Sequence, residues 1–205
     1  MGTNQFLLLE FFMNIFPLKK RTQFLILGFC MALIGGIGFW YWRPASTDPA
    51  LQFYQEKRDR SALVALFNEN WFWLDNRPQA EGLAAFNEHL DKITNPEEEA
   101  KPTKMSWLVY SVDGRARGFT SYFMRIPELK IGKILYLAVQ KEYRSQGIAR
   151  KLLNKAISTL KEMGARTIEI TVRLENYPAQ NLYRSLGFRP IGSDTQYFYM
   201  ELPVQ

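Results

Sequence analysis

The fold is decided by residues 133–150, which read KILYLAVQKEYRSQGIAR. The apolar run at the start of this stretch is typical of a strand, and residues 147–163 repeat apolar side chains at helical spacing. The first N–H groups of a helix have no intrahelical partner, the helix dipole is positive there, and Gly147 permits close approach of a ligand. Because Arg144 and Arg150 add charge, the loop between strand and helix predicts a phosphate or pyrophosphate site.

A second motif follows at residues 176–188, which read NYPAQNLYRSLGF. Together the two stretches resemble the GNAT acetyltransferase superfamily, nearest in motifs to ribosomal-protein alanine acetyltransferases. The acyl-CoA motif of that superfamily is Arg/Gln-x-x-Gly-x-Gly/Ala, and its second motif is Asn-x-x-Ala-x-x-Leu-Tyr-x-x-x-Gly-Phe. The matching residues are Arg144, Gly147 and Ala149 for the first motif, and Asn176, Ala179, Leu182, Tyr183, Gly187 and Phe188 for the second. The resemblance covers about residues 104–202, and more loosely 50–103.

The resemblance implies an α/β (α+β) fold with a mixed, mostly antiparallel sheet that is splayed into a V, flanked by helices, and opened by a bulge for acyl-CoA. The residue patterns agree with that order of elements. The expected elements are a strand at 51–56, a helix at 61–73 capped by Ser61, a helix opening at Pro78, a hairpin of 105–112 and 116–124 joined by Asp113-Gly114, a helix at 147–163, a strand at 167–172, a short helix between Pro178 and Gly187, and a last strand at 196–202.

The resemblance also implies where acetyl-CoA binds. The backbone of Leu137, Ala138 and Val139 is expected to pair with the pantetheine arm, as an added strand does. The pyrophosphate cradle is expected from a run of seven residues: Arg144, Ser145, Gln146, Gly147, Ile148, Ala149 and Arg150. Asn176 matches a residue that contacts the cofactor arm in that superfamily, and as an alternative or an addition it caps the helix that follows.

Two residues are candidates for the catalytic proton transfers. Tyr183 is the expected donor to the CoA thiolate, since phenol and thiol pKa values lie within about two units; the alternative is a core tyrosine. In ribosomal-protein alanine acetyltransferases a Glu stands five residues before the motif Asn, and here that place holds Thr171, which is not a base near neutral pH. Glu169 lies on the same strand face and replaces the base directly or through water, unless it is a surface carboxylate or a water chain takes the proton.

Composition excludes several classes of function. The 205-residue chain has a formal net charge of +6, spread without a basic stripe interleaved by aromatic residues, so nucleic acid is not an expected partner. Cys30 is the single cysteine and His89 the single histidine, so no disulfide framework and no metal site are expected.

The N-terminal part of the chain predicts a membrane anchor. Residues 22–42 carry no charge, suit a spanning helix, and end in Trp40, Tyr41 and Trp42. A buried core helix and a secretory signal are the alternatives. We therefore expect a single-pass membrane anchor at residues 1–43 and an acetyltransferase domain at residues 44–205. The basic residues before the run favour an outside domain, but acetyl-CoA is intracellular, so a cytoplasmic domain is expected.

The sequence thus predicts a membrane-anchored N-acyltransferase that moves an acetyl group from acetyl-CoA to a primary amine of an unknown acceptor. Trp71, Phe72 and Trp73 either line the acceptor site or pack in the core. The alternative function is a membrane-tethered acyl-CoA binding or sensing module with little catalysis, for which Thr171 is the main support.

Overall fold

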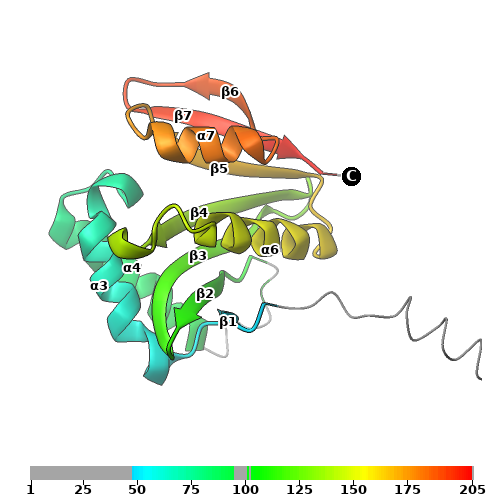
Figure 1. Ribbon diagram of the computed structural model, residues 1–205. Helices are drawn as coiled ribbons and strands as arrows, with labels where there is room; N and C mark the ends of the chain where they lie inside the picture. The colour runs from blue at the N-terminus through cyan, green and yellow to red at the C-terminus, as the bar shows by residue number, and fades with distance from the viewer. Residues whose placement is uncertain (1–47, 95–100, 102, 205) are drawn as a thin grey trace, which may run out of the picture. The chain divides into compact units, whose positions relative to one another are not determined.

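The architecture is built on one mixed sheet with the strand order β1-β2-β3-β4-β5-β7-β6 (Figure 1). The computed structural model describes residues 48–94, 101 and 103–204. Its strands are β1 (Leu51–Phe53), β2 (Ser106–Val112), β3 (Arg115–Ile126), β4 (Ile131–Val139), β5 (Thr167–Arg173), β6 (Arg189–Ser193) and β7 (Tyr197–Pro203). The helices are α3 (Glu56–Leu74), α4 (Gln79–Asp91), α6 (Ile148–Glu162) and α7 (Tyr177–Ser185). Only the β4–β5 pair is parallel among these strands, so the expected mixed, mostly antiparallel sheet is confirmed.

The sheet divides where β4 and β5 part. Their pairing runs only from Ile131↔Thr167 to Ile134↔Ile170, after which both strands continue without each other. In Figure 1, β5, β7, β6 and α7 form one arm of a V, and β1 to β4 form the other. Leu135 lies at the point of separation as a β-bulge, since Ser121 pairs with Tyr136 but Tyr122 pairs with Ile134.

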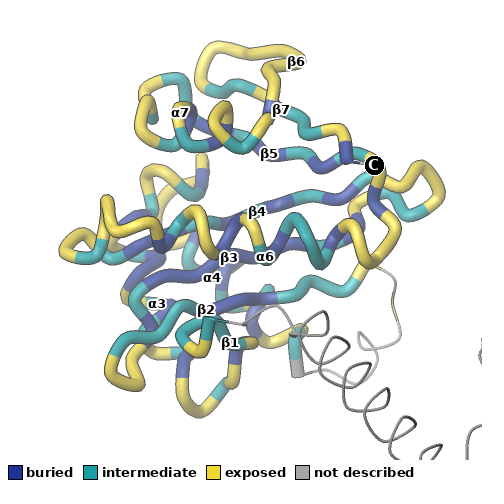
Figure 2. The backbone as a smooth tube through the Cα atoms, turned by 45° about the vertical axis from the view of Figure 1, so that its right-hand side comes forward, coloured by how far each residue is buried: buried dark blue, intermediate teal, exposed yellow. Residues whose placement is uncertain are grey.

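The bulge also decides which way β4 presents its side chains. Residues two apart on a regular strand share a face. Here Ile134 packs with α6 residues such as Leu153, whereas Tyr136 packs with Phe67 of α3 and Phe86 of α4. The two faces of the sheet therefore carry separate cores, one under α6 and one under α3 and α4, and buried positions follow β3 and β4 through both (Figure 2).

The first helix begins earlier than the sequence pattern predicted. The start expected at Ser61 is wrong, because α3 begins at Glu56 and Ser61 lies inside it. The carboxylate of Asp59 accepts a hydrogen bond from the N–H of Gln55 at 2.9 Å, so it satisfies a donor at the helix start. Arg58 forms an ion pair with the same carboxylate at 2.7 Å, and this pair compensates the nearly complete burial of Asp59.

The strand β6 was not expected from the sequence pattern. This strand pairs with β7 but is exposed at every position, and it is yellow in Figure 2. Pro190 and Gly192 lie in it and the register shifts between them, so no apolar alternation marks it. Within the described residues, 48–94, 101 and 103–204, no helix is long and apolar enough to cross a membrane, and the predicted anchor at 22–42 lies outside them.

Candidate active site

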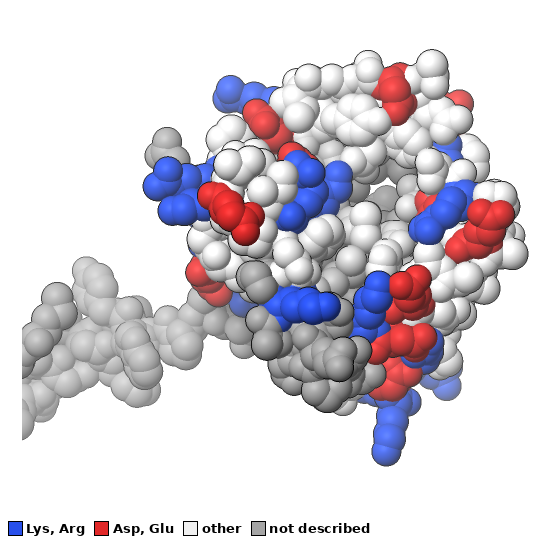
Figure 3. Space-filling view, turned by 180° about the vertical axis from the view of Figure 1, so that it is seen from behind, with Lys and Arg blue, Asp and Glu red and all other residues white. Residues whose placement is uncertain are grey.

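A cleft of about 700 Å³ opens where β4 and β5 part. Residues 134–139 of β4 and 170–172 of β5 line it, together with the start of α6, one side of α7, and Asn70, Trp73 and Leu74 of α3. Its volume is within the range of about 300–1,000 Å³ that is usual for small-molecule sites. Figure 3 shows a hollow on the face seen from behind, with Lys and Arg side chains at its rim.

Leu137, Ala138 and Val139 all line this cleft. They belong to the part of β4 that pairs with β3 on one side and, beyond Ile134, has no β5 partner on the other. Backbone polar groups on that open edge have no strand partner, so an extended ligand can bind there by adding a strand.

The loop before α6 has the backbone expected of an anion cradle. Gly147 is the N-cap residue with φ +78°, and no side chain caps the helix there. Ser145 also has positive φ, at 61°, which bends the loop around the helix end. The N–H groups of Ile148, Ala149 and Arg150 lie in the first turn and have no intrahelical acceptor. Gln146 alone of the seven predicted cradle residues does not line the cleft; its amide donates to the carbonyl of Glu142 at 3.2 Å.

Both arginines of the cradle line the cleft and also hold the surrounding elements together. Arg144 donates through Nη2 to Oδ1 of Asn70 at 2.7 Å and through Nε to the carbonyl of Val139 at 3.1 Å. Arg150 donates to Oγ of Ser185 at 2.7 Å, which joins α6 to α7. The sequence analysis missed Asn70, although a polar residue one turn after Leu66 and Phe67 breaks the apolar face of α3 and is a usable signal.

The two predicted residues of the second motif meet at the same cleft. Oδ1 of Asn176 accepts a hydrogen bond from the N–H of Ala179 at 3.2 Å, so its role as a helix cap is confirmed, and it also lines the cleft. Tyr183 lines the cleft with 6% of its surface exposed, and its hydroxyl has no hydrogen-bond partner among the described residues. Burial raises the pKa of Tyr183, so the phenol stays protonated but is a weaker acid than the sequence argument assumed.

Glu169, the predicted base, is not brought together with the other site residues. It does not line the cleft, and its Oε1 accepts a hydrogen bond from Arg125 at 2.8 Å. Thr171 does line the cleft, and its hydroxyl oxygen accepts a hydrogen bond from Nζ of Lys133 at 2.9 Å. Lys133 was also missed by the sequence analysis, although a charged residue within an apolar strand is a detectable irregularity.

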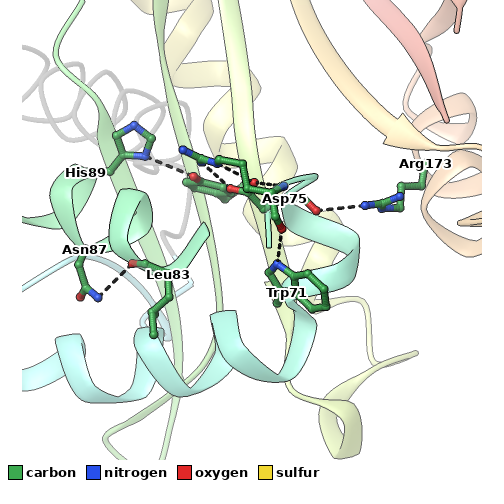
Figure 4. Close-up of polar contacts among 8 residues, drawn as sticks. Trp71, Asp75, Leu83, Asn87, His89 and Arg173 are labelled. Carbon is green, nitrogen blue, oxygen red and sulfur yellow. Dashed lines mark hydrogen bonds and ion pairs between the residues drawn. The ribbon is translucent and has the colours of Figure 1, made fainter. Parts of the chain in front are cut away.

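The C-terminal end of α3 is tied to the other arm by Arg173. The guanidinium donates to the carbonyl of Asp75 (Figure 4). It also donates to the carbonyl of Phe72 and lies 4.2 Å from the centre of the Phe72 ring. Burial alone would raise the pKa of the Asp75 carboxyl, but hydrogen bonds from Arg77 outweigh it and lower that pKa. Of the three predicted acceptor-site aromatics, Trp73 lines the cleft, whereas Trp71 donates to the carbonyl of Arg77 at 3.0 Å and Phe72 packs under Arg173.

The sequence profile of the Acetyltransferase (GNAT) family matches residues 61–188. The chain belongs to this GNAT family. The fold agrees: the crystal structure of PaiA N-acetyltransferase from Thermoplasma acidophilum in complex with coenzyme A superposes with a TM-score of 0.61 at 19% identity, over 75% of this chain and 99% of that one.

Two sequence relatives each match a little under half of this GNAT chain. A Bacillus subtilis (strain 168) protein named as a candidate [ribosomal protein bS18]-alanine N-acetyltransferase is 33% identical over 92 residues, which is 45% of this chain and 59% of the relative. An N-alpha-acetyltransferase of Sulfurisphaera tokodaii is 33% identical over 104 residues, 46% of this chain and 62% of the relative. The chain thus matches about three-fifths of the length of each.

The side chains at the cleft suit an anionic, extended cofactor. Across 48–94, 101 and 103–204, no group of three or more His, Cys, Asp or Glu side chains is arranged to hold a metal ion. The uncapped start of α6 and two arginines favour phosphate groups, and the open edge of β4 suits an amide-containing arm. Acetyl-CoA combines these two chemical features.

Proposed function

We propose that this protein is an N-acetyltransferase that moves the acetyl group of acetyl-CoA to a primary amine. The observation that carries the proposal is the cleft at the parting of β4 and β5, with the uncapped N-terminus of α6 beside it. A long cofactor with a pyrophosphate in its middle and an acyl thioester at one end fits such a cleft. Membership of the GNAT family supports the same chemistry.

Different residues along the cleft serve cofactor binding, activation of the thioester and proton transfer. The N–H groups at 147–150 bind the pyrophosphate, and the open edge of β4 at 137–139 holds the arm. A backbone N–H of the same edge polarises the thioester carbonyl. The amine nitrogen then attacks the carbonyl carbon, a C–N bond forms and the C–S bond breaks. Tyr183 donates its proton to the leaving thiolate and is reprotonated by the proton that the nitrogen loses as the amide forms.

The acceptor enters by the end of the cleft that α3 borders. Trp73 and Leu74 line that end, and Trp73 keeps 41% of its surface exposed. Arg173 fixes the backbone of Phe72 and Asp75 there, so this border of the cleft is held in place. The names of the relatives place peptide α-amines among the acceptors to be tried, and the proposal itself is limited to a primary amine.

Turnover with an acceptor panel tests this function. The full-length chain, kept in detergent, is mixed with acetyl-CoA and with amines, peptides and aminoglycosides, and released CoA thiol is measured. We expect release that depends on an amine and an acetylated product of matching mass. Binding of acetyl-CoA without any release would instead identify an acyl-CoA binding or sensing module.

We further propose that residues 1–43 anchor the protein to a membrane through a single helix at 22–42, with residues 44–205 on the cytoplasmic side. The support is the uncharged run itself and its aromatic end. The cytoplasmic side follows from the intracellular supply of acetyl-CoA. Protease accessibility of the domain in sealed vesicles of known orientation tests the side.

A further inference from the structure

The apex of the V is the place where an acyl group would meet its acceptor. The cradle lies beyond the C-terminal end of β4, and the open edge of β4 leads from it back toward Leu135. Thr171 is the first residue of β5 beyond the last pair with β4, and it lines the cleft. A thioester at the end of an arm that follows β4 therefore arrives beside the Thr171 hydroxyl.

Behind this hydroxyl lies an amine. Gly132 faces α6, where an added Cβ would come within 2.9 Å of Leu160, so the next residue, Lys133, points to the opposite face of the sheet. Its Nζ donates to Oγ1 of Thr171 at 2.9 Å. Lys133 itself does not line the cleft, so its route to a bound acceptor passes through the threonine.

The surroundings of Lys133 favour its neutral form. Burial lowers the pKa of the Lys133 ammonium, the nearby Arg125 lowers it further, and the carboxylate of Glu169 raises it in part. These two groups face it from β3 and β5, and Glu201 of β7 lies one strand further as the partner of Glu169. A lowered pKa increases the fraction of neutral amine, and the neutral amine is the form that a general base requires.

We propose that Thr171 and Lys133 form a relay that removes the proton from the acceptor ammonium, in place of a carboxylate base. This inference rests on the proposed acetyl transfer. When Lys133 is neutral, the Thr171 hydroxyl turns to donate across the same 2.9 Å contact to the Nζ lone pair. The ammonium N–H bond of the acceptor then breaks and its proton passes to Oγ1 of Thr171, while the Thr171 hydroxyl proton passes to Nζ. The neutral amine attacks the thioester carbon. As the amide forms, the nitrogen loses one proton and the thiolate gains one, so these two protons balance. Lys133 then releases to solvent the proton that it accepted from the acceptor ammonium.

Two other titratable groups near the cleft, Glu169 and His89, serve this role less well. Glu169 is ion-paired to Arg125 and does not line the cleft. His89 is held neutral by burial, which lowers its pKa, but it does not line the cleft and reaches it only through the hydroxyl of Tyr136 at 3.3 Å. The Tyr136 side chain packs with residues of α3 and α4, and Tyr136 also lines the cleft.

Four substitutions separate a relay from a merely structural pair. Lys133→Arg keeps the charge and a donor to Thr171 but cannot lose its proton, and Lys133→Met removes both. Both variants should lower kcat at pH 7.5 by about 100-fold or more, as removal of a general base typically does. Thr171→Val should act in the same direction, Thr171→Ser should restore most of the rate, and acetyl-CoA binding should change by less than about twofold throughout. The matched control is Lys161→Met on the exposed side of α6, which should keep the wild-type rate.

The pH dependence gives a signed test. Activity should fall at low pH as Lys133 becomes protonated. Glu169→Gln removes a carboxylate that raises the Lys133 pKa, so the acidic limb should move to lower pH. Arg125→Gln removes a cation that lowers it, so that limb should move to higher pH. Loss of activity in Glu169→Gln at every pH would make Glu169 the base, and a wild-type rate in Lys133→Arg would also overturn the relay.

A labelling experiment decides the matter even without turnover. The full-length chain is acetylated by trace acetic anhydride across a pH series, and the labelling of Lys133 is read by peptide mass spectrometry against a lysine peptide standard with pKa about 10.4. We expect Lys133 to titrate below the standard and lower still in Glu169→Gln. If Lys133 titrates with the standard, the relay is wrong, whether or not the protein transfers acetyl groups. If amines give no CoA release while the Lys133 pKa is lowered as expected, the proposed function fails and the proton-accepting site stands.

Discussion

Substitution of Gly147 tests the anion cradle most directly, because the same helix supplies a matched control. Gly147 stands at the start of α6 with φ +78°, and Gly164 stands just past its end with φ +92°. At both positions a Cβ would find no atom within 4 Å, so an added side chain costs backbone strain without a clash. Only Gly147 lines the cleft.

The effect on stability should be similar at the two sites. Left-handed backbone costs an L-residue roughly 1–2 kcal/mol, and a domain of this size loses about 2–4 °C in Tm per kcal/mol. Gly147→Ala and Gly164→Ala should therefore both lower Tm by about 2–8 °C. Gly147→Asp should unfold at a slightly higher temperature than Gly147→Ala, since a carboxylate at a helix N-terminus returns about 0.3–1 kcal/mol.

The effect on binding should separate the two sites. A carboxylate about 5 Å from a phosphate charge, at an effective dielectric constant of about 20, costs roughly 3 kcal/mol before screening by salt. A penalty of about 2–3 kcal/mol weakens acetyl-CoA binding by roughly 30- to 150-fold. Gly164→Asp places the same charge at the other end of the helix and should leave the Kd within about twofold.

Isothermal calorimetry with acetyl-CoA at two salt concentrations measures both the loss and its electrostatic origin. The Kd of Gly147→Asp should approach that of Gly147→Ala as salt rises, because the charge contribution is screened. Unchanged binding in Gly147→Asp, or an equal loss in Gly164→Asp, would refute the placement of the pyrophosphate at this loop.

Three further outcomes are expected. Tyr183→Phe should lower turnover, measured by steady-state kinetics, by about tenfold or more. The binding free energy of acetyl-CoA, measured by calorimetry, should change by less than about 1 kcal/mol. Full activity across the pH range would show that Tyr183 only packs in the core. Asn70→Leu removes the buried oxygen that receives Arg144 and should weaken acetyl-CoA binding by roughly 1.5–3 kcal/mol; an unchanged Kd would show that this contact does not position the cradle. Deletion of residues 1–43 should convert a membrane-bound protein into one found in the soluble fraction, and a full-length chain that fractionates as soluble without detergent would contradict the proposed anchor.

The cradle and the second motif could be predicted because their requirements are local. The cradle needs a strand end, a residue that accepts positive φ and an uncapped helix start, and all three lie within 133–150. Asn176 caps α7 through a partner three residues away, and Gly187 follows the end of that helix with φ +94°. Such features depend on neighbours in the sequence, so the order of residues determines them.

Sequence alone offered Glu169 as the candidate base, whereas the proposed relay of Thr171 and Lys133 depends on neighbours across the sheet. Glu169 and Thr171 share a strand face, but only the parting of β4 and β5 after Ile170 puts Thr171 in the cleft and leaves Glu169 beside Arg125. Lys133 reaches Thr171 from a strand 38 positions earlier in the chain.

The frame of the cleft was likewise decided by tertiary structure. The resemblance to other chains suggested a bulge, but the register of β3 against β4 is what places it at Leu135 and turns Tyr136 to the opposite core. Asn70 receives Arg144 across a separation of 74 residues, and Arg173 holds the carbonyl of Asp75 across 98. No local pattern specifies such contacts, because they form only when packed faces of the sheet bring the segments together.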